Sequence, residues 1–177
     1  MREPFVLLLF LQLALGTLPL SPFIDEPVTL TTVSGGASIE IAEGLSASAR
    51  GGTVSYRSPQ LVLNEGWLAE VDLQFDFVVA SDSLKLYGGI GGLYTNLNYS
   101  RTLGENVYQR SGEAYVPCLF LGTKLFFPTT LGALGVLGEV KLSPEVRLTS
   151  TLENIGGWRF AIGVVYHCGT AGDCQED

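Results

Sequence analysis

The side chains that could perform catalysis are few and far apart in the sequence. The chain has a single histidine, His167, which Cys168 and Gly169 follow directly. Nucleophilic or general base catalysis would need this histidine beside a serine and a carboxylate that orients it. A lone histidine at the end of an apolar segment is more often an interface or capping residue. We therefore predict no catalytic residue and expect that the protein is not an enzyme.

The cysteines do not have the pattern of a metal site. The sequence contains no C-x-x-C pair and no Cys/His cluster with zinc spacing, so we predict no metal ion and no cofactor. Cys168 and Cys174 are six residues apart, close enough to form a disulfide in an oxidising compartment. Cys118 lies in an apolar segment and is expected to be a small buried side chain.

Two further patterns resemble binding sites, and each has a simpler interpretation. Glu70, Asp72 and Asp76 alternate along one segment and could hold a cation, but pairing with basic side chains on the same face explains them more simply. The glycines of GGIGGL do not form the phosphate-binding G-x-G-x-x-G, because Tyr94 occupies the last glycine position and no helix follows.

Composition indicates one domain with an unusual surface. The chain has 177 residues, of which 46% are hydrophobic and 16% charged, whereas soluble domains carry about 25% charged residues. Such a chain has either a large dry core or a surface that faces something other than water. The net charge of −8 and the scattered Lys and Arg residues exclude a nucleic-acid partner.

The N-terminal segment predicts export. One basic residue precedes an apolar run from Phe5 to Leu15, which is shorter than the roughly 20 residues of a transmembrane helix. The run matches the apolar region of a secretory signal, and Ala14-Leu15-Gly16 resembles a small-x-small cleavage site. We predict a signal peptide over residues 1–21, with an uncleaved membrane anchor as the alternative.

The remainder of the chain has the period-2 alternation of β-strands. Over residues 67–79, apolar side chains alternate with mostly polar ones, and similarly long segments follow. Strands in globular proteins peak near 5–6 residues, whereas a membrane-spanning strand needs about 9–11. Connections also alternate between short, at 81–83 and 128–130, and long, at 99–111 and 143–156, which is typical of outer-membrane barrels.

The strand count depends on the N-terminal third. Residues 28–44 predict a hairpin around Gly35-Gly36, and residues 46–58 predict a second hairpin or one strand bent at Gly51-Gly52. Three strands before Trp67 give an all-β, eight-stranded antiparallel up-and-down transmembrane β-barrel over residues 27–167, with ten strands as the alternative. Residues 168–177 form a short C-terminal tail.

The alternation also predicts which face meets lipid. If the apolar faces point outward, Trp67, Trp158 and Tyr166 fall where aromatic residues concentrate at membrane interfaces. Acidic and basic side chains then meet inside a lumen that eight strands leave just wide enough to fill. Mixed signs can pair there, so we predict a plugged, salt-bridged interior formed by Glu70, Asp72, Asp76 and Glu139 with Lys85, Lys124, Lys141 and Arg159.

Residues 67–167, especially YGGIGGLY, FLGTKLFF and GWRFAIGVVY, resemble the small outer-membrane β-barrels of the OmpX/opacity type from Gram-negative bacteria. The resemblance implies a location in the outer membrane, and it implies a C-terminal aromatic residue that the assembly machinery reads. Tyr166 is the nearest match, although eleven residues follow it. The group includes lipid A deacylases with a His-x-Ser pair, and that serine is absent after His167.

We therefore predict a non-enzymatic, monomeric barrel in contact with outer-membrane lipid. It would present surface loops 99–111 and 143–156 for adhesion, ligand contact or envelope integrity. The first alternative is a secreted soluble β-barrel or sandwich that binds an apolar ligand inside. The minor alternative is a lipid A-modifying barrel enzyme.

Overall fold

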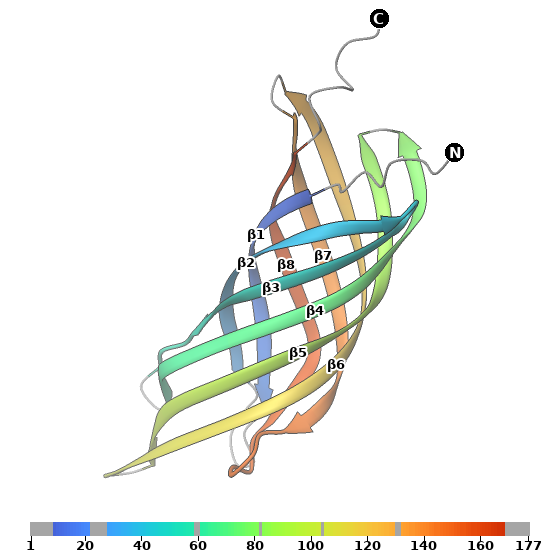
Figure 1. The fold of residues 1–177 in the computed structure, drawn as a ribbon. Helices are drawn as coiled ribbons and strands as arrows, with labels where there is room; N and C mark the ends of the chain where they lie inside the picture. Colours follow the sequence, from blue (N-terminus) through green and yellow to red (C-terminus); the bar gives the residue numbers. More distant parts are fainter. Residues whose placement is uncertain are drawn as a thin grey trace, which may run out of the picture.

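The computed structural model is a closed barrel of eight antiparallel strands (Figure 1). It describes residues 9–21, 28–58, 61–81, 83–103, 105–129 and 132–168. The strands are β1 (Leu9–Ser21), β2 (Val28–Ala42), β3 (Leu45–Ser55), β4 (Leu61–Ser81), β5 (Leu84–Leu103), β6 (Asn106–Thr129), β7 (Gly132–Arg147) and β8 (Asn154–Cys168).

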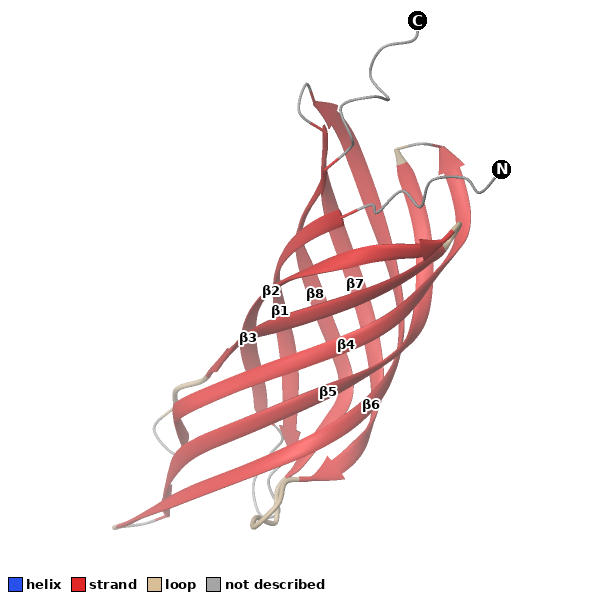
Figure 2. Cartoon of the chain, viewed as in Figure 1, coloured by secondary structure: helices blue, strands red, loops and turns tan. Residues whose placement is uncertain are grey.

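Each strand pairs with the next along the chain, and β1 pairs with β8 to close the ring. The predicted up-and-down topology and the count of eight strands are therefore confirmed. Figure 2 shows strands along almost the whole described chain. No helix in the described part of the chain is long and apolar enough to cross a membrane.

The first strand corrects the predicted start of the barrel at residue 27. β1 lies between β2 and β8, with Leu13 opposite Gly35 on one side and Val164 on the other. The apolar run taken for a signal region alternates: Leu11, Leu13 and Leu15 are exposed outward, whereas Gln12 and Ala14 are buried. A leucine-rich strand and the apolar region of a secretory signal have similar compositions, so the sequence alone does not separate the two. Cleavage after residue 21 would remove β1; the signal peptide itself stays a prediction.

Neither glycine pair makes a turn, which contradicts the predicted hairpin at Gly35-Gly36 and agrees with the alternative of one strand through Gly51-Gly52. β2 and β3 each run unbroken through their Gly-Gly pair, and Gly35 lies opposite Gly51 in the ladder. A Cβ atom on Gly36 would collide with the Ala49 carbonyl oxygen and the Arg50 backbone. These glycines therefore let two strands approach closely, and the predicted hairpin at Gly35-Gly36 is wrong.

The connections at the two ends of the barrel differ in length as predicted, although the difference is smaller than expected. The turn end carries the short connections after β4 and β6. At the opposite loop end, most of 99–111 is strand, because β5 and β6 pair as far as Leu103 and Asn106 (Figure 1). The segment 143–156 is also partly strand and leaves a loop at 148–153 between β7 and β8.

The interior is layered. Toward the loop end it contains one large apolar cluster of Leu18, Leu20, Leu30, Val54, Leu61, Leu68, Leu93, Leu97, Tyr99, Ala114, Val116, Leu148 and Ile155. A second, small cluster of Phe126, Leu137 and Val165 lies toward the turn end. Buried charged side chains from β3, β4, β7 and β8 occupy another part of the lumen. Exposed apolar side chains cover the outside, so the faces are oriented as predicted.

Candidate functional site

A buried guanidinium group is the centre of the lumen charges. Arg50 on β3 contacts three carboxylates: Asp72 at 2.7 Å, Glu139 at 2.6 Å and Glu70 at 3.1 Å. All four side chains are at most 8% exposed. Sequence reasoning missed Arg50, because the side chains around it in SASARGG are so small that they define no face. Its place in the alternation Ser46, Ser48, Arg50 was the signal available.

Two further cations complete this charge cluster, which comprises Arg50, Glu70, Asp72, Glu139, Lys141 and Arg159. The Nζ atom of Lys141 lies 2.6 Å from Asp72 and 3.1 Å from Glu70, and Arg159 contacts Glu70 at 2.9 Å. Three cations thus balance three carboxylates. Because buried charges are tolerated when they are paired and hydrogen-bonded, a neutral cluster is the form such a lumen can hold.

Small residues and a tyrosine make room for this cluster. Tyr87 donates a hydrogen bond to Glu139 at 2.8 Å, and Gly122 leaves space for the Tyr87 ring. Gly91 similarly leaves space for the Asp72 carboxylate. Gly91 and Gly122 on the charged face therefore accommodate large side chains on the neighbouring strands.

The other predicted lumen charges lie beside the cluster, toward the turn end. Lys124 donates to Gln74 at 2.9 Å and lies 4.5 Å from the centre of the Tyr87 ring. Lys85 pairs with Asp76 at 3.6 Å in a more exposed position. All eight predicted charges thus belong to the inward face.

The chemistry of these groups favours structure over catalysis. The oxygen or sulfur atoms of Glu70, Asp72 and Cys118 lie within 4.8 Å of one another and could in principle hold a metal ion. However, the carboxylates already contact Arg50 and Lys141, which neutralise their charge. The ring of His167 lies 6.5 Å from that of Phe126. The absence of a metal and of catalytic residues stays a prediction.

The cysteines are only partly described. Cys118 is a free, buried thiol, as expected. Cys174 lies outside the described residues, so the Cys168–Cys174 disulfide stays a prediction.

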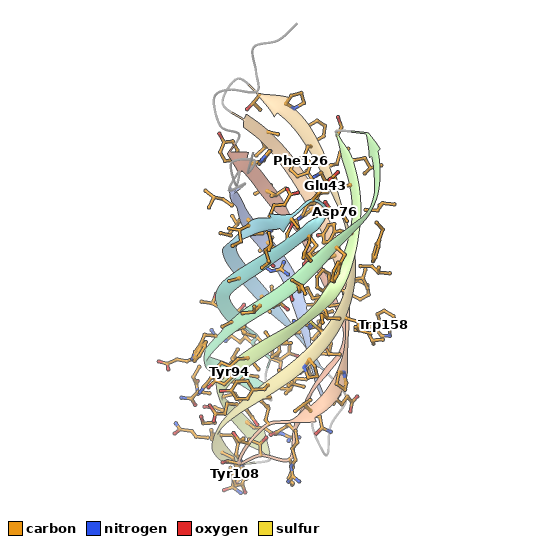
Figure 3. All side chains as sticks on the ribbon, turned by 45° about the vertical axis from the view of Figure 1, so that its right-hand side comes forward. Glu43, Asp76, Tyr94, Tyr108, Phe126 and Trp158 are labelled. Carbon is orange, nitrogen blue, oxygen red and sulfur yellow. The ribbon has the colours of Figure 1, made fainter. Side chains whose placement is uncertain are left out.

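A cavity opens at the loop end and is lined by basic side chains. Its volume is about 590 Å³, and Arg101, Tyr108, Arg110 and Arg147 line it together with the loop 148–153. Figure 3 shows Tyr108 at this end of the barrel. Both segments predicted as contact loops thus contribute to one cavity.

Hydrogen bonds hold the loop that forms one wall of this loop-end cavity. The N–H of Leu148 donates to the Glu153 carbonyl at 2.9 Å, and Arg147 donates to the Thr151 carbonyl at 2.8 Å. Glu153 accepts a hydrogen bond from Tyr99 and lies 3.6 Å from Arg101. Three guanidinium groups thus line the cavity with a single carboxylate, which makes it locally positive on an acidic chain.

Aromatic side chains cluster on the outer surface near the loop end. The rings of Trp67 and Tyr94 are 4.9 Å apart, and those of Tyr94 and Tyr115 are 4.6 Å apart. Trp158 also points outward and is 59% exposed (Figure 3). This placement is typical of membrane–water interfaces.

Comparison with known proteins identifies the fold. No protein-family model matches the chain, and no curated protein matches it. Among solved structures, Neisserial surface protein A (NspA) is similar with a TM-score of 0.61 and 14% identity, over 89% of this chain and 96% of that chain.

Two further solved structures are similar. Ail, the attachment invasion locus protein of Yersinia pestis, has a TM-score of 0.51 and 11% identity, over 90% of this chain and 97% of that chain. The N-terminal β-barrel domain of Pseudomonas aeruginosa OprF has a TM-score of 0.50 and 14% identity, over 88% and 96%. The chain therefore has the fold of the small eight-stranded barrels of bacterial outer membranes.

Proposed function

We propose that this protein is a non-enzymatic barrel of the bacterial outer membrane, closed to solutes, whose loop end binds an anionic ligand outside the cell. The observation that carries the proposal is the distribution of side chains: apolar outside, paired charges inside, and arginines at the loop end.

The outer surface supports a membrane location. Apolar side chains such as Val71, Leu121 and Ile162 are each more than 60% exposed. In water such a surface would aggregate, whereas an outward apolar band with aromatic residues at its edge matches a transmembrane barrel. The soluble alternative requires the apolar face inside, which is opposite to the observed orientation.

The lumen supports a barrier and not a pore. The charge cluster is neutral, and an apolar layer lies between it and the loop end. The cavity beside the cluster has a volume of only about 30 Å³, enough for roughly one water molecule. Reconstituted protein should give no steady conductance in planar bilayers. A large and stable conductance would contradict a closed lumen.

The loop-end cavity supports ligand contact. Arg101, Arg110 and Arg147 present planar guanidinium groups, which match the oxygens of sulfate, phosphate and carboxylate groups. Tyr108 adds an exposed aromatic ring, a common element of binding surfaces. We therefore assign an anionic ligand, such as an acidic saccharide, to this end.

Binding of a sulfated disaccharide, with its unsulfated parent as a reference, tests this assignment. Arg110→Gln should weaken binding of the sulfated form by about ten- to hundredfold, because a hydrogen bond to a charged group contributes about 1.5–3 kcal/mol. Arg57→Gln is the matched control, since Arg57 is exposed after β3 and does not line the cavity. Equal losses in both variants, or equal binding of both sugars, would refute the assignment.

A further inference from the structure

The loop 148–153 between β7 and β8 contains a residue with a strained backbone. Ser150 has a φ angle of 61°, in the left-handed region that residues with a Cβ atom rarely adopt. It is the only non-glycine residue with a positive φ in the described ranges. The other described positions with a positive φ all carry glycine, namely Gly44, Gly132, Gly156 and Gly157. The chain therefore keeps serine at a position where glycine would be less strained.

A tight turn imposes this backbone conformation. The N–H of Thr151 donates to the Leu148 carbonyl at 3.4 Å, so Ser150 occupies the third position of a four-residue turn. Turns with a positive φ at that position favour glycine. Two hydrogen bonds to β6 hold the turn in place: the Thr149 N–H donates to the Glu113 carbonyl at 2.9 Å, and the Thr149 Oγ1 atom accepts from the Glu113 N–H at 3.0 Å.

The fold uses two of the three hydroxyl groups in this loop. The Thr149 hydroxyl joins the loop to β6. The Thr151 hydroxyl donates to the Leu148 carbonyl at 3.3 Å and accepts from the Glu153 N–H at 3.3 Å. The third hydroxyl group, that of Ser150, makes no hydrogen bond with another described residue. Ser150 is exposed and lines the loop-end cavity, so its hydroxyl group is accessible to a ligand there.

The combination of strain and an unused hydroxyl group indicates a role in binding. Residues in unfavourable backbone conformations cluster at ligand sites and switch regions, where function retains them. The serine side chain contributes nothing to the hydrogen bonds of the loop, and glycine would suit the backbone better. The side chain itself is therefore what the cavity requires at this position.

The hydroxyl group adds an exposed acceptor to a cavity whose cations can only donate. The three arginines of the cavity carry N–H donors and no acceptor, so they suit the oxygens of an anionic group. The Glu153 carboxylate is an acceptor, but it is buried and already accepts a hydrogen bond from Tyr99. The Ser150 oxygen can accept a hydrogen bond from a ligand hydroxyl group. This set of groups fits an anion that also carries hydroxyl groups, as an acidic saccharide does.

We propose that Ser150 is a specificity-determining residue of the loop-end cavity, and that its hydroxyl group accepts a hydrogen bond from a sugar hydroxyl next to the anionic group that the arginines bind. The inference rests on the proposed function and deepens it, because it narrows the ligand from any anion to a hydroxylated one.

Two substitutions separate the hydroxyl group from the backbone strain. Ser150→Ala removes the hydroxyl and keeps the strain, because alanine also has a Cβ atom, whereas Ser150→Gly removes both. Each variant should bind the sulfated disaccharide about three- to tenfold more weakly than the wild type, the effect of one lost neutral hydrogen bond. Only Ser150→Gly should also raise the urea midpoint of unfolding in lipid vesicles. A residue with a purely structural role would not lower the affinity while it raises the stability.

Isothermal titration of the full chain in detergent micelles measures the affinities, with inorganic sulfate as a second probe. Sulfate has no hydroxyl group to donate to Ser150, so the wild type and both variants should bind it equally. Ser111→Ala is the matched control, because Ser111 is exposed on β6 and does not line the cavity. This control should keep the wild-type affinity for the sulfated disaccharide.

The outcomes separate the contact by Ser150 from the proposed function. Equal affinity of the wild type and Ser150→Ala for the disaccharide would overturn the contact, even where Ser150→Gly binds more weakly, because loop order would then explain the loss. Equal weakening for sulfate and disaccharide would also overturn it. A urea midpoint that does not rise in Ser150→Gly would remove the strain on which the inference depends. A wild type that binds neither probe would refute the anionic site itself.

Discussion

Arg50 should be the most sensitive single position in the lumen. Arg50→Met removes the guanidinium that contacts Glu70, Asp72 and Glu139 at 2.6–3.1 Å. The cluster of three cations and three carboxylates then carries one uncompensated negative charge inside the barrel. Removing one partner of a buried ion pair costs about 3–5 kcal/mol, so we expect a loss in this range in the free energy of unfolding.

The same reasoning predicts partial rescue. Adding Glu139→Gln to Arg50→Met restores two cations and two carboxylates. The double variant should then be more stable than the sum of the single losses predicts, by about 0.5–3 kcal/mol, the usual coupling between interacting residues.

Urea unfolding in lipid vesicles, followed by tryptophan fluorescence, measures these free energies. Lys85→Met is the control, because the Lys85–Asp76 pair is longer, at 3.6 Å, and more exposed. Its loss should be at most about 1 kcal/mol. The reasoning fails if Arg50→Met costs no more than Lys85→Met, or if the losses in the double variant are simply additive.

Two further predictions concern the outer surface and the first strand. Ile162→Lys places a charge on an outward position whose side chain is 63% exposed. Near the midplane of a bilayer the substitution should lower the free energy of unfolding by about 2–4 kcal/mol, whereas a soluble barrel would tolerate it. Urea unfolding in vesicles separates the two cases. Removal of residues 1–21 deletes β1 and leaves β2 and β8 each with an unpaired edge. The remaining chain should therefore form no barrel, which a missing heat-dependent gel shift would show. A folded barrel from residues 22–177 would instead support the predicted signal peptide.

The strongly alternating C-terminal part of the sequence predicts the structure well. On β8, Trp158, Phe160, Ile162 and Val164 are exposed outward, and Arg159 is buried and paired inward. Period 2 and long strands are sufficient there, because every second side chain is large and apolar. The lumen charges on β4 and β7 follow from the same pattern.

The N-terminal strands could not be read in this way. Composition makes the apolar run of β1 equivalent to a signal region, and only its pairing with β2 and β8 distinguishes the two. In β2 the Gly-Gly pair is interpreted as a turn, and in β3 it leaves a hairpin and a single strand both open, until the register places Gly35 opposite Gly51.

The small residues of β2 and β3 hide both the course of these strands and the role of Arg50 from sequence analysis. Gly36 on β2 lies opposite Arg50 in the ladder and leaves space beside its side chain, because an added Cβ would lie only 2.8 Å from the Arg50 Cγ. The glycine that suggests a turn in β2 therefore makes room for the central guanidinium group. Without Arg50, the inward charges of the cluster sum to −1, and a buried net charge is unfavourable. The cluster thus needs a third cation, and Arg50 supplies it from β3, one of the strands whose faces the sequence leaves undefined.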